Sequence, residues 1–213
     1  MSGGRRAALP ALAGLSLSLA AVSSAGAQTT GDARLARLDA VTRHAVRAIV
    51  DSAHATKLPT EPLVDKALEG ARRGADGGRI VGAVRALAAD LSAARLALGP
   101  DAAAAEITSG AHALHAGFQA GDLTRLRAAS RQGGRPGRGV TLPLAIATDL
   151  VARSVPPPRA LGIVLSLTRA GVHDAELTAF QRNVRLDIER GADPSSAAET
   201  RARGALLRSG RSS

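Results

Sequence analysis

Apolar side chains recur every three or four residues through most of the chain. The clearest stretch lies between residues 79 and 98, where the apolar positions are Ile80, Val84, Leu87, Leu91, Ala94 and Leu98. This spacing places the side chains on one side of an α-helix. Groups of glycine, proline and aspartate separate the periodic stretches, and residues of these types commonly end one helix and begin the next.

The pattern predicts an all-α fold of about nine short helices. Their expected ranges are 33–55, 61–73, 79–98, 102–116, 121–131, 141–153, 159–170, 175–190 and 195–208. We expect Thr60, Asp101 and Asp193 to cap the helices that follow them. Short polar side chains at these positions accept hydrogen bonds from the first free N–H groups of a helix.

Four of the turns share one pattern. Gly74, Gly117, Ser154 and Gly191 each close a helix and precede an apolar residue, and they are 43, 37 and 37 residues apart. A small residue permits a left-handed turn at a helix end, and the apolar residue packs back on the helix. The spacing predicts tandem helical hairpins, arranged as a degenerate α-solenoid or an irregular helical bundle. It lies near the lengths of tetratricopeptide and HEAT repeats, but the consensus of neither is present. In a solenoid, the concave face is the expected binding surface.

The first 27 residues have the layout of a secretory signal peptide. Arg5 and Arg6 precede an apolar run over residues 9–22, and small residues at 25–27 form a cleavage site. We therefore expect export to the bacterial periplasm or the cell exterior, with removal of residues 1–27.

The remaining chain is expected to form one domain. We predict a single all-helical domain at 28–208, with a Gly/Arg-rich loop at 131–139 and a disordered tail at 209–213. No stretch after the signal peptide is apolar over enough residues to span a membrane.

The composition restricts both the core and the chemistry. Phe118 and Phe180 are the only aromatic residues, so the core must consist of Ala, Leu, Val and Ile. Cysteine is absent, which excludes disulfides, thiolate nucleophiles and cysteine metal ligands. The formal net charge is +10, and every basic residue except Lys57 and Lys66 is arginine. This excess favours anionic partners, although ordinary solvated helix faces are its commoner source.

No stretch carries a recognisable catalytic motif. His112 and His115 lie one helical turn apart, as two metal ligands on a helix would, but Glu106 is out of phase for a third ligand. We therefore expect a solvated helix face here, with no metal site, no cofactor and no catalytic residue.

The loop at 131–139 supplies the candidate anion-binding residues. Arg131, Arg135 and Arg138 stand among glycines, and a flexible backbone can bring guanidinium groups onto phosphate or sulfate. A plain glycine-rich linker is the alternative interpretation of this loop.

These observations lead to two expectations about function. The first is a non-catalytic exported helical-repeat protein that acts as a binding or scaffold module, with another envelope or secreted protein as its partner. The alternative is an arginine-rich envelope-surface protein that binds anionic lipid or polysaccharide. Nucleic acid is not an expected partner, because binding by base stacking needs aromatic residues among the charges. An enzyme with an unrecognised site is a third hypothesis.

Overall fold

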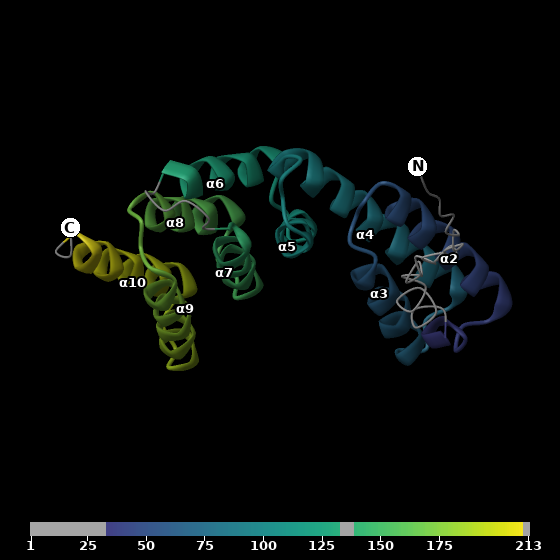
Figure 1. The fold of residues 1–213 in the computed structure, drawn as a ribbon. Coiled ribbons are helices and arrows are strands. Elements are labelled where there is room, and N and C mark those ends of the chain that lie inside the picture. The colour runs from purple at the N-terminus through teal and green to yellow at the C-terminus, as the bar shows by residue number, and fades with distance from the viewer. Residues whose placement is uncertain (1–32, 133–138, 211–213) are drawn as a thin grey trace, which may run out of the picture.

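The computed structural model describes residues 33–132 and 139–210 and confirms the all-α fold, because these residues form helices and no strand. Residues 33–35 are helical, and nine longer helices follow in the described part of the chain (Figure 1). They are α2 (Ala40–Ala55), α3 (Glu61–Arg72), α4 (Gly77–Leu98), α5 (Ala104–His115), α6 (Ala120–Gln132), α7 (Thr141–Ala152), α8 (Pro157–Arg169), α9 (Asp174–Glu189) and α10 (Pro194–Ser209).

The helices form an open arch with two rows. Helices α4, α6, α8 and α10 run along the outer side of the arch, and α3, α5, α7 and α9 lie on its inner side (Figure 1). Helices one or two places apart along the chain provide the main packing contacts. The core is one apolar cluster that extends from Leu35 to Ala205 and includes Phe118 and Phe180. This open tandem array corresponds to the solenoid alternative, since a closed bundle would bring distant helices together.

The left-handed turns are confirmed at all four predicted positions. The φ angles are 69° at Gly74, 100° at Gly117, 70° at Ser154 and 93° at Gly191. At each turn this residue and the next donate their N–H groups to carbonyls of the last helical turn, which is the Schellman arrangement. Residues 57–58 and 171–172 form two further turns of this kind, so the repeated turn is more frequent than the sequence pattern indicated.

The inner helices also share a register relative to their turns. Seven residues before the turn, each inner helix buries a residue against its neighbours: Ala67, Gly110, Ala147 and Val184. Ten residues before it, three helices bury an aliphatic residue, while Gln181 of α9 is only half-buried. The common register is consistent with a tandem arrangement of helical hairpins.

Two helices begin later than predicted. The first long helix begins at Ala40, because the Asp39 carboxylate accepts hydrogen bonds from the N–H groups of Val41 and Thr42 at 3.0 and 2.9 Å. Helix α5 begins at Ala104, where Glu106 reaches back to the Ala103 N–H at 3.0 Å and Asp101 caps nothing.

The other two predicted caps have different outcomes. Asp193 caps α10 through the Ser196 N–H at 2.8 Å, as predicted. Thr60 precedes α3 but makes no side-chain capping bond.

The predicted ends of the chain are only partly described. Helix α10 continues through Ser209, so the predicted disordered tail begins too early; residues 211–213 lie outside the described residues. The predicted signal peptide also lies outside them. Within the described segments, no helix has both the length and the apolar character needed to cross a membrane.

Candidate functional site

The candidate site forms because α4 is much longer than the other outer helices. Helix α4 has 22 residues, whereas α6 and α8 have 13 each. Helix α3 packs on the first half of α4, where Gly70 lies against Ile80, and α5 packs on the second half, where Gly110 lies against Ala94. Helices α5 and α7 pack together, as do α7 and α9, but α3 and α5 have no comparable contact within the described residues. The middle of α4 is therefore uncovered on the inner side.

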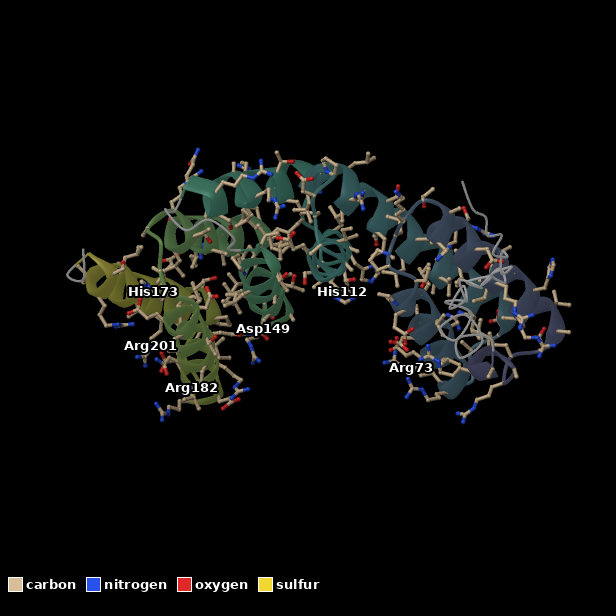
Figure 2. All side chains as sticks on the ribbon, viewed as in Figure 1. Arg73, His112, Asp149, His173, Arg182 and Arg201 are labelled. Atoms are coloured by element: carbon tan, nitrogen blue, oxygen red, sulfur yellow. The ribbon has the colours of Figure 1, made fainter. Side chains whose placement is uncertain are left out.

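A groove of about 930 Å³ occupies this gap. Its floor is apolar and consists of Ala83, Ala86 and Leu87 from α4. Helix α3 provides one wall and α5 the other, and Figure 2 shows Arg73 and His112 on these two helices at opposite sides of the gap. The wall residues are Pro62, Asp65, Lys66, Glu69, Arg72, Arg73, Thr108, His112 and His115.

The wall formed by α3 presents an excess of positive charge. Glu69 pairs with both Lys66, at 3.1 Å, and Arg73, at 2.7 Å. The hydrogen bond and charge of Lys66, followed by the charge of Arg73, lower the pKa of Glu69. Two cations thus share the single carboxylate of Glu69. Arg72 is in no ion pair within the described residues, and its Nε donates only to the Leu68 carbonyl, at 3.4 Å.

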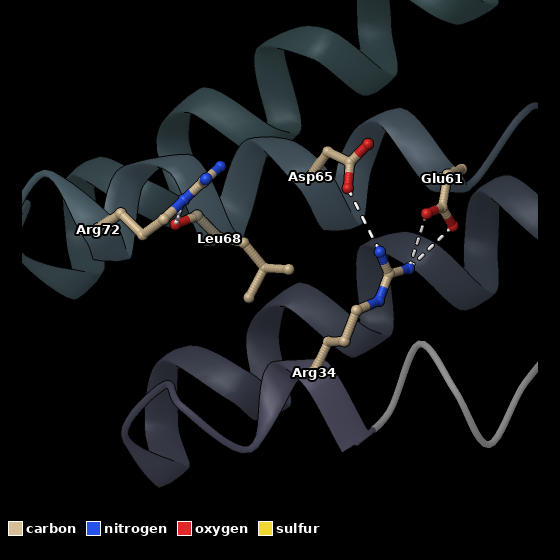
Figure 3. A network of polar contacts seen from close by, with 5 residues as sticks. All are labelled: Arg34, Glu61, Asp65, Leu68 and Arg72. Carbon is tan, nitrogen blue, oxygen red and sulfur yellow. Dashed lines mark hydrogen bonds and ion pairs between the residues drawn. The ribbon is translucent and has the colours of Figure 1, made fainter.

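Asp65, the other carboxylate of this wall, pairs with a residue outside the groove. Arg34, in the helical residues before α2, pairs with Glu61 at 2.8 Å and with Asp65 at 3.4 Å (Figure 3). Arg34 therefore neutralises part of the negative charge on α3. The groove is left with Lys66, Arg72 and Arg73 as its dominant charges.

The wall formed by α5 carries the two histidines. Both side chains are exposed, as predicted, and the Nδ1 atom of His115 lies 3.7 Å from a carboxylate oxygen of Asp90. Within the described segments, no three His, Asp or Glu residues are close enough together to hold a metal ion. The two histidines line the groove as exposed polar side chains.

The structure does not place the predicted anion-binding residues in this groove. Arg131 is exposed near the end of α6, and it is not among the residues that line the groove. Arg135 and Arg138 lie outside the described residues.

A second, smaller hollow of about 280 Å³ lies between α7 and α9. Its lining includes Asp149, Arg153, Arg182 and Arg185. Asp149 pairs with Arg153 at 3.1 Å, and Arg185 pairs with Glu189 at 3.6 Å. Figure 2 shows Asp149 and Arg182 on the inner side of the arch, on the far side of the His112 helix from the larger groove.

Sequence reasoning missed the groove, although one signal for it was present. The spacing from Gly74 to Gly117 is 43 residues, whereas the next two spacings are 37. The extra residues lie in the interval that contains α4. A longer interval in an otherwise regular repeat can therefore mark the place where neighbouring inner helices separate.

Comparisons with known proteins identify no relative: no family model matches the sequence, and no curated protein or solved structure matches the chain.

Proposed function

We propose that this chain is a non-catalytic, exported binding module that holds a segment of another envelope or secreted protein in the groove between α3 and α5. The observation that carries the proposal is the groove itself: an apolar floor between charged walls on the inner side of a helical array. Open helical-repeat arrays use their concave faces as extended binding surfaces. The signal-peptide layout of residues 1–27 supports the cellular location.

Site-specific photocrosslinking in the cells that make the protein tests the groove. A photoreactive residue replaces Ala86 on the floor, and a matched one replaces Leu96, which is 81% exposed and does not line the groove. We expect one dominant crosslinked protein from position 86 and none from position 96. The same products from both positions, or none from either, would contradict binding in the groove.

The export part of the proposal has its own test. Mass spectrometry of the protein from cell fractions should find it outside the cytoplasm, with Gln28 as its first residue. Recovery of the unprocessed chain from the cytoplasm would refute export.

A second candidate function is binding of anionic lipid or polysaccharide. Arg153, Arg182 and Arg185 gather in the smaller hollow on the same inner side. Contacts of this kind weaken as salt is added, because mobile ions screen exposed charges. We expect sedimentation with anionic vesicles to fall with rising salt and on changing Arg182 and Arg185 to Ala. Changing Arg131, Arg135 and Arg138 to Ala tests the loop separately, and salt-insensitive sedimentation would count against this function.

A further inference from the structure

We infer that the groove takes one amphipathic α-helix of the partner protein, with acidic residues beside its apolar stripe, as an added member of the inner row. This inference rests on the proposed function and specifies the segment that would be bound. It follows from the space in the inner row, the character of the floor and the charge of the walls.

The space matches one helix. Successive inner helices pack on each other from α5 to α9, and the row is interrupted only between α3 and α5 in the described part of the chain. Helix α4 has nine more residues than α6 or α8. At 1.5 Å per residue this adds about 13 Å along the arch, close to the diameter of one helix with its side chains. The interruption is therefore as wide as one missing helix.

The floor suits a helix better than an extended peptide. Ala86 and Leu87 lie three and four residues after Ala83 on α4, so the side chains of both neighbour Ala83 and the three form one apolar patch. Small side chains allow the backbone of a second helix to approach closely. An extended peptide would bring unpaired N–H and C=O groups to this apolar patch, whereas a helix satisfies its own backbone groups.

The walls favour negative charge on the occupant. Glu69 already pairs with two cations and Asp65 with Arg34, while Arg72 has no ion pair within residues 33–132 and 139–210. Thr108, His112 and His115 add no negative charge on the opposite wall. A helix with carboxylates facing α3 would complement Lys66, Arg72 and Arg73, and basic helices would be repelled.

Three synthetic peptides test the inference by fluorescence anisotropy with the processed protein. Each has 16 residues, the length of α9. The first has a Leu/Ala stripe flanked by Glu, the second has Lys in place of Glu, and the third is the Glu peptide with two central prolines. We expect the Glu peptide to bind with a Kd below about 100 μM and the other two to bind about tenfold more weakly or worse.

Two variants locate the binding. Ala86→Glu places a carboxylate on the floor, and we expect it to weaken binding of the Glu peptide about tenfold. The control Arg85→Glu makes a larger change in net charge on an exposed neighbour outside the groove, and we expect less than about a twofold change. Circular dichroism of each variant verifies that it is folded.

Each result tests a separate part of the inference. If the Lys peptide binds as tightly as the Glu peptide, the bound segment need not be acidic. If the proline peptide binds as tightly as the Glu peptide, the bound segment need not be helical. Failure of all three peptides, or equal loss in both variants, would overturn the inference. If the photoreactive residue at position 86 still crosslinks one dominant protein in cells, the proposed function survives the failure of the peptides. If it crosslinks none, the proposed function and this inference both fail.

Discussion

At the scale of single residues, Glu106 is the clearest departure from the repeat. Eleven residues before their turns the other inner helices bury Leu63, Pro143 and Phe180, but α5 buries this carboxylate. Its oxygens accept hydrogen bonds from the N–H groups of Val140, at 2.9 Å, and Ala103, at 3.0 Å, and it pairs with Arg127. One side chain thus connects the starts of α5 and α7 with α6.

Replacing Glu106 with Gln should destabilise the protein. The amide keeps one acceptor oxygen but turns an NH₂ group toward an N–H donor, and it leaves Arg127 without its counter-ion. We expect the free energy of unfolding to fall by about 3–5 kcal/mol, as for other buried pairs that lose one partner. Urea denaturation measures this change. Glu189→Gln, at an exposed pair on α9, is the control and should cost less than about 1 kcal/mol.

The environment of Glu106 also predicts that acid destabilises the fold. Burial acts to raise the pKa of Glu106, but the N–H groups of Val140 and Ala103 and the charge of Arg127 outweigh burial and lower it below 4.5. A carboxyl group with a lowered pKa stabilises the fold above its unfolded pKa, and this contribution is lost as pH falls through the folded pKa. We expect the stability gap between the native protein and Glu106→Gln to narrow as pH falls below 4.5. A constant gap in pH-dependent denaturation would contradict this account.

Two of the turn residues lead to opposite predictions for thermal stability. Ser154 adopts a φ of 70° with a side chain attached, while Gly191 occupies the equivalent turn at 93°. Left-handed backbone costs a residue with a Cβ atom about 1–2 kcal/mol, partly offset by the greater freedom of glycine in the unfolded chain. We expect Ser154→Gly to raise the midpoint of thermal unfolding and Gly191→Ala to lower it. Midpoint shifts of the same sign in both variants would show that the left-handed backbone conformation does not cause the stability changes.

At the scale of helices, periodicity predicted every long helix, and turn residues predicted most of their ends. The Schellman turns were predictable because they depend on a few consecutive residues. The Glu106 cluster was not, because Arg127 and Val140 lie 21 and 34 residues away from it. The groove was also missed, since it depends on where α3 and α5 meet α4, and apolar periodicity contains no information about that distance.

The packing of α4 can be tested at its first residue. A Cβ atom added at Gly77 would lie 2.0 Å from the Thr42 hydroxyl oxygen of α2, whereas one added at Gly82 would meet nothing within 4 Å. Thr42 is buried and β-branched, so it has little room to move. We expect Gly77→Ala to destabilise the protein by about 1–3 kcal/mol. Gly82→Ala should stabilise it by about 0.5–1 kcal/mol through helix propensity, and chemical denaturation of both variants checks the contrast.

At the scale of the whole molecule, the open arch predicts that disturbances remain local. Each helix packs mainly on helices one or two places away in the chain, so stability in such an array is a sum of neighbouring contacts. We expect Glu106→Gln to speed amide hydrogen exchange in α5, α6 and α7, and Gly77→Ala to speed it in α2, α3 and α4. Helix α10 should exchange at the native rate in both variants. Uniform acceleration along the chain would mean that the nine helices unfold as a single unit; the stability of the groove would then depend on the far end of the arch, not only on α3, α4 and α5.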